Sequence, residues 1–90
     1  MNAVQKSGHP WQIVRVPGIC GGEPIVQGTR IPVKSIVVQW MQYRGVDRVR
    51  NAFPRLDSEA VQCALDYYAN HTAEIDQLIQ ESEQAANATT

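Results

Sequence analysis

Hydrophobic residues follow two different spacings in the two parts of this chain. Before residue 32, short runs of β-branched and aromatic residues are separated by glycine and proline, as in short strands joined by turns. After residue 32, apolar residues recur three or four positions apart, as on one face of a helix. The pattern predicts a mainly α fold with a small N-terminal β platform over residues 11–32.

The β platform is expected to turn often. Residues 11–16 are rich in strand-forming side chains and stop at Pro17. Residues 25–31 can extend on either side of Gly28, which offers a backbone position free to take a positive φ. Short extended segments and tight reversals are therefore predicted in place of long strands.

Two short helices are predicted next. Pro32 suits the first turn of a helix, because its missing N–H has no intrahelical partner there, and the apolar spacing then runs over residues 33–44. Asp47 can cap a second helix over residues 47–53, which Pro54 closes.

A third, longer helix is predicted over residues 58–83. Asp57 can cap it, and Leu56 and Val61 have the spacing of a hydrophobic staple. Residues 70–72 are weak helix formers and could mark a bend. A continuous helix of roughly 26 residues would be about 39 Å long, longer than the rest of the domain can cover.

The far half of this helix has apolar residues that need a partner. Ile75, Leu78 and Ile79 can pack against another molecule, or the segment can fold back as a hairpin within the chain. Both arrangements are open at this stage. Residues 11–83 form a single predicted domain, between a flexible N-terminus over residues 1–10 and a frayed tail over residues 84–90.

Charge is divided along the chain, although the formal net charge is only −1. Residues 1–56 carry all eight Lys and Arg residues and two acids, a formal charge of +6. Residues 57–90 carry seven acids and no Lys or Arg, a formal charge of −7. Two surfaces of opposite sign suggest two different partners.

Two short helices and a longer third one have the layout of a helix-turn-helix domain. The third helix begins with Asp57 and Glu59, which would repel phosphates, so neighbouring arginines would have to supply the affinity for DNA. A solvated basic face that keeps the domain soluble is the alternative. The candidate DNA-binding residues are Arg30, Lys34, Arg44, Arg48, Arg50, Arg55, Ser58 and Gln62.

Candidate catalytic chemistry is sparse. Cys20 and Cys63 lack metal-ligand spacing, His9 and His71 are far apart, and no glycine-rich phosphate loop precedes a helix. We expect no enzyme activity, cofactor, metal or small-molecule substrate. The start of the chain has no apolar signal region and no run is long enough to span a membrane, so a cytoplasmic protein with free thiols is expected.

One run of residues is specific enough to suggest a family. The string GGEPIVQGTRIPV at residues 21–33, followed by Gly45, by FPRL at 53–56 and by ALDYY at 64–68, resembles the bacterial domain of unknown function 433 family. The resemblance covers about residues 11 to 80. It implies a homeodomain-like or winged-helix-like helix-turn-helix domain, often an antitoxin of the VapB kind encoded beside a PIN-like ribonuclease toxin.

The resemblance also assigns roles to residues. It places residues 28–33 at the entry to the first helix in an architectural role, with Arg30 either bonding backbone carbonyls or facing a ligand. The segment from Gly45 to Phe53 is a residue or two shorter than in the family, and Arg48 and Arg50 stand where the family has acids. That departure favours a DNA-facing second helix and puts the length of that helix in question.

These observations lead to an expected function. A homodimer would place its basic side on operator DNA and hold a PIN-like toxin with its acidic helix, either by covering a basic RNA-binding rim or with Arg30 or Arg44 reaching the metal site. A dimeric interaction module that touches no nucleic acid is the alternative. The candidate partner-binding residues are Glu74, Ile75, Asp76, Leu78, Ile79 and Glu81.

Overall fold

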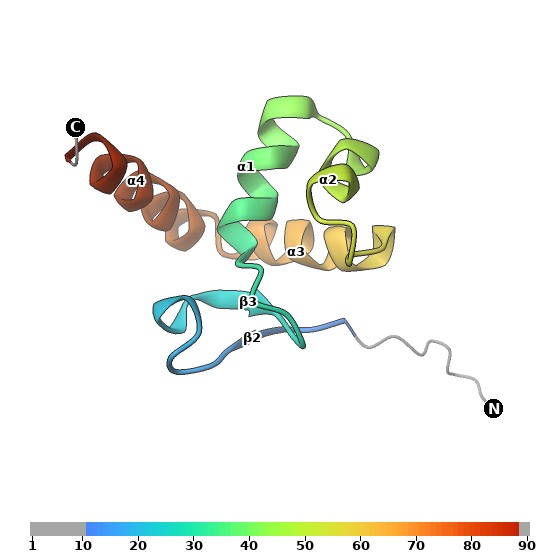
Figure 1. Cartoon of the computed structure of the whole chain (residues 1–90), viewed down its shortest axis with the longest axis horizontal. Helices are drawn as coiled ribbons and strands as arrows, with labels where there is room; N and C mark the ends of the chain where they lie inside the picture. The colour runs from blue at the N-terminus through green and yellow to red at the C-terminus, as the bar shows by residue number, and fades with distance from the viewer. Residues whose placement is uncertain (1–10, 89–90) are drawn as a thin grey trace.

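Four helices and a two-stranded sheet make up the part of the chain that the computed structural model describes, residues 11–88 (Figure 1). The prediction of a mainly helical fold with a small N-terminal β platform is confirmed. In chain order the elements are β2 Ile13–Arg15, the 3-10 turn η1 Cys20–Gly22, β3 Pro24–Val26, α1 Val33–Tyr43, α2 Val46–Ala52, α3 Ser58–Asn70 and α4 Thr72–Ala88.

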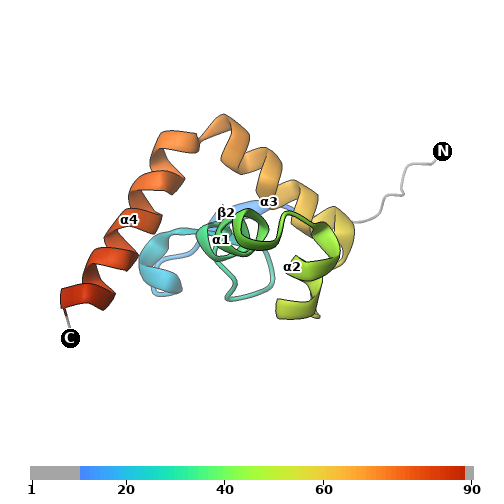
Figure 2. The same cartoon turned by 90° about the horizontal axis from the view of Figure 1, so that it is seen from above.

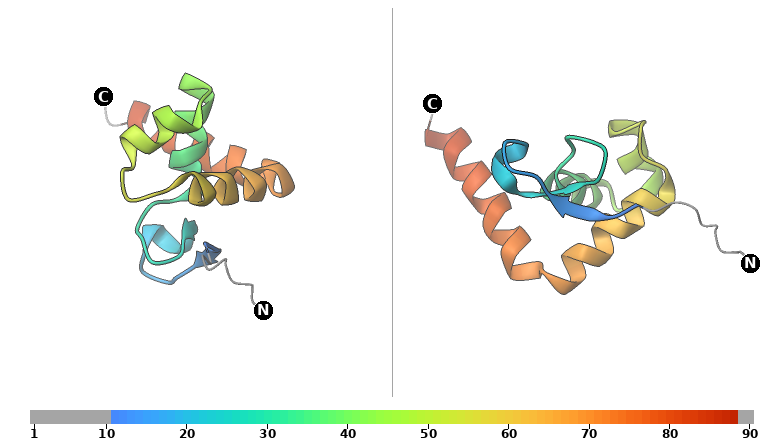
Figure 3. Two further views of the ribbon diagram at one scale, coloured as in Figure 1. Left: turned by 90° about the vertical axis from the view of Figure 1, so that its right-hand side faces the viewer. Right: turned by 90° about the horizontal axis from the view of Figure 1, so that it is seen from below.

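The platform is an antiparallel pair of strands, with Ile13 opposite Val26. Figure 3 shows it as a layer on one side of the helices. After β3 the chain reverses at Gly28, whose φ of +83° gives the predicted positive value. Thr29 fixes the reversal, because its hydroxyl donates to the carbonyl of Val26 at 2.7 Å and accepts from the N–H of Ile31 at 3.0 Å. This reversal delivers the chain to the start of α1.

Helix α1 is the centre of the fold. It lies between α2 and α4, while α3 crosses it from below (Figure 1). Side chains from every helix and from β3 meet on the buried face of α1 and form one hydrophobic core. The fully buried apolar residues are Pro24, Ile25, Val26, Val33, Ile36, Val37, Val49, Leu56, Ala60, Val61, Ala64 and Ile75.

The start of α3 agrees with the sequence. The Asp57 carboxylate accepts the backbone N–H of Ala60 at 2.9 Å, which makes it the predicted cap. Leu56 and Val61 are both buried in the core, as expected for the hydrophobic staple.

The boundary between α1 and α2 differs from the prediction. Gly45 is the N-cap residue of α2 with an extended backbone, and Asp47 lies in the first turn, so the prediction that Asp47 caps this helix is wrong. Arg44 makes the turn that ends α1, with φ 54° and ψ 40° in the left-handed region, and its N–H donates to Trp40 O at 2.6 Å. Helix α1 consequently ends at Tyr43, one residue earlier than predicted.

The prediction of one continuous helix over residues 58–83 is also wrong. The helix breaks at His71, and α4 turns back beside α1, so that α3 and α4 form a V (Figure 2). The His71 N–H donates to Tyr68 O at 3.1 Å, which leaves Tyr67 O without its usual helical donor, and His71 Nδ1 lies 3.0 Å from Tyr67 O. The Thr72 hydroxyl also donates to Tyr68 O, at 2.8 Å.

Helix α4 continues to Ala88, so a frayed tail beginning at residue 84 is wrong for residues 84–88. Residues 1–10, predicted as a flexible N-terminus, and residues 89–90 lie outside the described residues. Of the two arrangements left open for the far half of the third helix, the structure has the hairpin. Ile75 is buried at 0% exposure in the core of its own chain, and Leu78 and Ile79 pack partly against that core.

The folded-back position of α4 predicts a large effect for Ile75→Ala. Removing a fully buried isoleucine side chain should lower the free energy of unfolding by roughly 2–4 kcal/mol, through lost burial and the cavity left behind. Urea denaturation at two protein concentrations measures this, and the loss should not depend on concentration because the contact is within one chain. Gln77→Ala, at an exposed position two residues away, serves as the control. A loss below about 1 kcal/mol for Ile75→Ala would contradict the packing of α4 on α1.

Candidate functional site

A cluster of polar contacts holds the corner between α3 and α4. The Tyr67 hydroxyl donates to Glu74 Oε1 at 3.1 Å, and the Tyr68 hydroxyl donates to Asp76 Oδ1 at 2.7 Å. Arg15, at the end of β2, forms an ion pair with Glu74. Two acids expected to bind a partner are therefore engaged by the chain itself. These five residues are called the corner clamp below.

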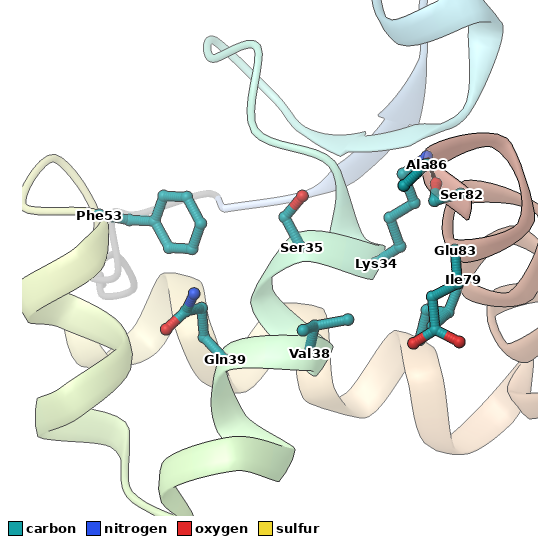
Figure 4. Close-up of a pocket in the computed structure, with 9 residues that line it drawn as sticks. All are labelled: Lys34, Ser35, Val38, Gln39, Phe53, Ile79, Ser82, Glu83 and Ala86. Carbon is teal, nitrogen blue, oxygen red and sulfur yellow. Dashed lines mark hydrogen bonds between the residues drawn. The ribbon is translucent and has the colours of Figure 1, made fainter. Parts of the chain in front are cut away.

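Lys34 forms a second tie between α4 and the rest of the fold. Its ammonium group donates to Glu23 Oε2 at 2.8 Å and to Ser82 Oγ at 2.6 Å. Figure 4 shows the Lys34 side chain pointing to α4 and Ser82, away from Phe53 at the end of α2. The structure therefore directs Lys34 away from the candidate DNA-binding residues around α2.

Exposed arginines gather around α2. Arg48 and Arg50 lie on the helix and Arg55 lies in the turn after it, and none of them pairs with a carboxylate among the described residues. The Arg48 guanidinium lies over the Tyr43 ring at 5.8 Å from its centroid, and Arg50 Nε donates to Leu56 O at 3.4 Å. These three arginines are called the α2 basic surface below.

Two further arginines of the predicted DNA-binding set lie elsewhere. Arg44 adjoins the α2 basic surface at the end of α1, with its guanidinium 5.1 Å from the centroid of the Trp40 ring. Arg30 is exposed in the loop that precedes α1. The structure therefore brings Arg44 together with the α2 basic surface and leaves Arg30 in a different part of the fold.

The start of α3 offers little for reading bases. Ser58 and Gln62 are exposed as predicted, but the Gln62 amide already donates to Asp66 Oδ1 at 2.9 Å. Glu59 lies in the first turn, where its charge suits the helix dipole and would repel phosphate. Any DNA contact through this region would depend on arginines and the phosphate backbone.

A groove between α1 and α4 is a feature that sequence reasoning missed. It has a volume of about 410 Å³. Its lining residues are Lys34, Ser35, Val38 and Gln39 on α1, Ile79, Ser82, Glu83 and Ala86 on α4, and Phe53 at the end of α2 (Figure 4). A second hollow of about 320 Å³ shares Ile79 and Glu83 with it. The two hollows together are called the α1–α4 groove below. No signal in the sequence indicated it, because Val38 and Met41 lie among the apolar positions of α1 and only the packing of the helices leaves them exposed.

The thiol of Cys63 is shielded. Cys63 Sγ donates to the carbonyl of Trp11 at 3.3 Å, and burial, with a smaller effect from Asp66, raises the pKa of the Cys63 thiol. A raised pKa disfavours the thiolate, which is the nucleophilic and metal-binding form. Among residues 11–88, no three His, Cys, Asp or Glu side chains are grouped to hold a metal ion. None of the helices in the same range has the length and apolar character of a membrane span.

Comparison with known sequences identifies the family. A family profile described as "Protein of unknown function (DUF433)" matches residues 13–68, more than half of the chain. The chain belongs to the DUF433 family. In this DUF433 domain the matched segment runs from β2 to Tyr68 in α3, so it ends before the helix break and α4.

Two known proteins are similar to this chain. A crystal structure of a DUF433 member protein from Anabaena variabilis ATCC 29413 is 32% identical, with a TM-score of 0.70 over 76% of this chain and 67% of that one. The uncharacterized protein y4eO of Sinorhizobium fredii (strain NBRC 101917 / NGR234) is 39% identical over 51 residues. That alignment spans 57% of this chain and 23% of y4eO, so the chain matches less than a quarter of that relative.

The hydrogen bond between Tyr68 and Asp76 in the corner clamp should depend on pH. The hydrogen bond to Asp76, followed by smaller effects of burial and of the Asp76 charge, raises the pKa of Tyr68 above its usual range. The phenol donates only while protonated, so its stabilisation is present below the ordinary tyrosine pKa and is lost as pH rises through the raised one. Asp76→Asn should lower the pKa of Tyr68, measured by NMR titration of its ring. Glu81→Gln, also on α4, should leave that pKa unchanged, and an equal effect of both variants would contradict the clamp.

Proposed function

We propose that this chain is an antitoxin-like component of a bacterial toxin-antitoxin system that acts in the cytoplasm. In this proposal it binds and inhibits a PIN-like ribonuclease toxin, and as a homodimer it binds operator DNA for autoregulation. The observation that supports it best is the position of two oppositely charged surfaces on the two sides of α1. The α2 basic surface lies on one side and the acidic helix α4 on the other (Figures 1 and 2).

The DNA-binding part of the proposal depends on the α2 basic surface. Arg48, Arg50 and Arg55 are exposed beside a helix-turn-helix arrangement and have no carboxylate partner among the described residues. Guanidinium groups in this state can bind phosphate oxygens. The acidic start of α3 makes phosphate contacts, in place of base reading, the expected source of affinity.

The toxin-binding part depends on what α4 leaves exposed. Glu74 and Asp76 are held in the corner clamp, whereas Glu81 and Glu83 lie farther along the helix and are exposed. Acidic side chains cannot neutralise the acidic metal site of a PIN-like nuclease, so the helix would cover a basic RNA-binding rim. The rival arrangement, an arginine reaching the metal site, favours Arg30, because the guanidinium of Arg44 is placed on Trp40.

A specific observation favours a second candidate, a dimeric interaction module without nucleic-acid binding. The exposed side of α3 presents Glu59 and Asp66, and Asp66 holds the Gln62 amide that would read a base edge. A domain of this kind would use α4 for its partner and leave the α2 basic surface solvated. Measurements of DNA binding separate the two candidates.

Binding to the chain's own promoter fragment should depend on salt through the α2 basic surface. Each phosphate contact adds about 0.9 to the magnitude of the log–log salt slope, so replacing Arg48, Arg50 and Arg55 by alanine should reduce it by about 2.7. Fluorescence anisotropy over a series of salt concentrations measures the slope. Lys34→Ala is the control and should leave it unchanged, since Lys34 is held by Glu23 and Ser82. A wild-type chain that does not bind the fragment, or binds without salt dependence, would favour the interaction module.

Toxin inhibition should depend on the exposed acids of α4. If the neighbouring reading frame encodes a PIN-like protein, co-expression with the wild-type chain should relieve growth arrest. Glu81→Lys with Glu83→Lys should weaken the complex on the order of tenfold or more, because like charges then face the basic rim. Asp47→Lys with Asp66→Lys makes the same change in charge on α2 and α3 and should leave protection intact. Equal protection by both double variants would contradict the acidic-helix arrangement.

A further inference from the structure

The α1–α4 groove has an apolar floor exposed to solvent. Among the described residues, the large hydrophobic side chains that are exposed are Val16, Val38, Met41 and Tyr43. Val38 and Met41, at 39% and 41% exposure, lie one turn apart on α1, and each borders one of the two hollows that meet at Ile79 of α4. Apolar side chains from two helices thus line a single trough, which is the arrangement of a helix-binding groove.

The dimensions of the trough suit a short helix. Its two hollows, of about 410 and 320 Å³, follow α4 over residues 73–86. At 1.5 Å per residue this stretch is about 20 Å long, the length of three to four helical turns.

Backbone hydrogen bonding identifies the occupant as a helix. The groove runs along two α-helices, α1 and α4, whose N–H and C=O groups bond within each helix, and Phe53 at the end of α2 adds an aromatic side chain to its lining. An extended peptide laid in the groove would find no backbone partners there and would leave its own polar groups buried and unsatisfied. A helix makes its backbone hydrogen bonds internally. The groove then has to supply only apolar contacts and polar or charged side-chain contacts.

The charge of the walls identifies the flanks of that helix. Helix α4 contributes Asp76 and Glu83 to the lining and has no Lys or Arg, while Lys34, the cation that lines the groove, is paired with Glu23. A negative wall beside an apolar floor is complementary to a basic amphipathic helix. A second copy of this chain offers acidic α3 and α4, where like charges repel, and its basic helix α2 has only 7 residues, about half the length of the groove.

We infer that the α1–α4 groove receives an amphipathic helix of a separate partner protein. An apolar ridge of that helix packs on Val38, Met41 and Ile79, and flanking Lys or Arg residues face the acids of α4. The assignment of that partner as the toxin rests on the function proposed above. Binding of a basic amphipathic helix to the groove can be tested without the toxin.

The test uses the full chain and a labelled synthetic helix of about four turns, with leucines at i, i+3, i+4 and i+7 spacing and lysines on both flanks. Fluorescence anisotropy should show binding to the wild-type chain, and binding at least about tenfold weaker to Val38→Asp. Val16→Asp is the matched control, because Val16 is exposed to 37%, almost as much as Val38, and lies after β2, outside the groove; it should bind like the wild type. A peptide with glutamate in place of lysine should bind at least about tenfold more weakly.

Three results would overturn the inference: no binding of the lysine peptide to the wild-type chain, equal binding by Val38→Asp, or equal binding of the two peptides. Met41→Lys gives a second variant in the groove, and urea denaturation of each variant establishes that it is folded. Sedimentation analysis tests whether a second copy of the chain occupies the groove. A wild-type dimer that Val38→Asp converts to a monomer would assign the groove to a second copy and would also overturn the inference.

The same variant separates this inference from the proposed function. If the neighbouring toxin is inhibited equally by the wild-type chain and by Val38→Asp, the antitoxin function stands and the toxin does not bind in the groove. If the wild-type chain fails to bind the toxin but still distinguishes the two peptides, the groove inference stands and the antitoxin function falls.

Discussion

The packing of one face of α1 is the constraint on which the rest of the structure depends. Val33, Ile36 and Val37 are fully buried, and the β platform, α2, α3 and α4 all contact this helix. The buried side chains of residues 11–88 form one core cluster, so an element in this range that leaves α1 has no second core to hold it. The outer face of the same helix, with Val38 and Met41, remains exposed and can contact other molecules.

Internal ion pairing decides which charges remain available outside. Arg15 and Lys34 are used to hold α4, and Glu74 and Glu23 are their partners. The cations left on the surface are therefore mainly those around α2, and the acids left on α4 lie toward its C-terminal half. Each of these two ion pairs neutralises one positive and one negative charge. The difference in charge between the two halves of the sequence is therefore still present on the surface of the fold.

Much of the architecture could be predicted from local rules. The cap at Asp57, the Leu56–Val61 staple, the reversal at Gly28 and the start of α1 each depend on residues close together in the sequence. The break at His71 was only suggested by weak helix formers, because the bend is also held by the distant Arg15. The end of α1 was misplaced because Arg44, in place of a glycine, adopts the left-handed conformation that ends the helix.

The candidate site was less predictable than the fold. Exposed arginines on α2 followed from composition and helix placement, whereas the burial of Ile75 and the groove beside Ile79 arise only when α4 meets α1. Spacing along one helix describes which residues share a stripe, but it does not say which other helix covers that stripe. For that reason Val38 and Met41 could not be separated from core residues in advance.

The left-handed conformation of Arg44 has a consequence for sequence variation at that position. Glycine and asparagine adopt this conformation with little strain, so relatives with either residue at position 44 can keep the same junction between α1 and α2. Valine or isoleucine would clash with the backbone there, and a chain carrying one of them would have to end α1 at a different residue. Mutational tolerance at this one site is therefore set by backbone geometry, whatever the guanidinium contributes.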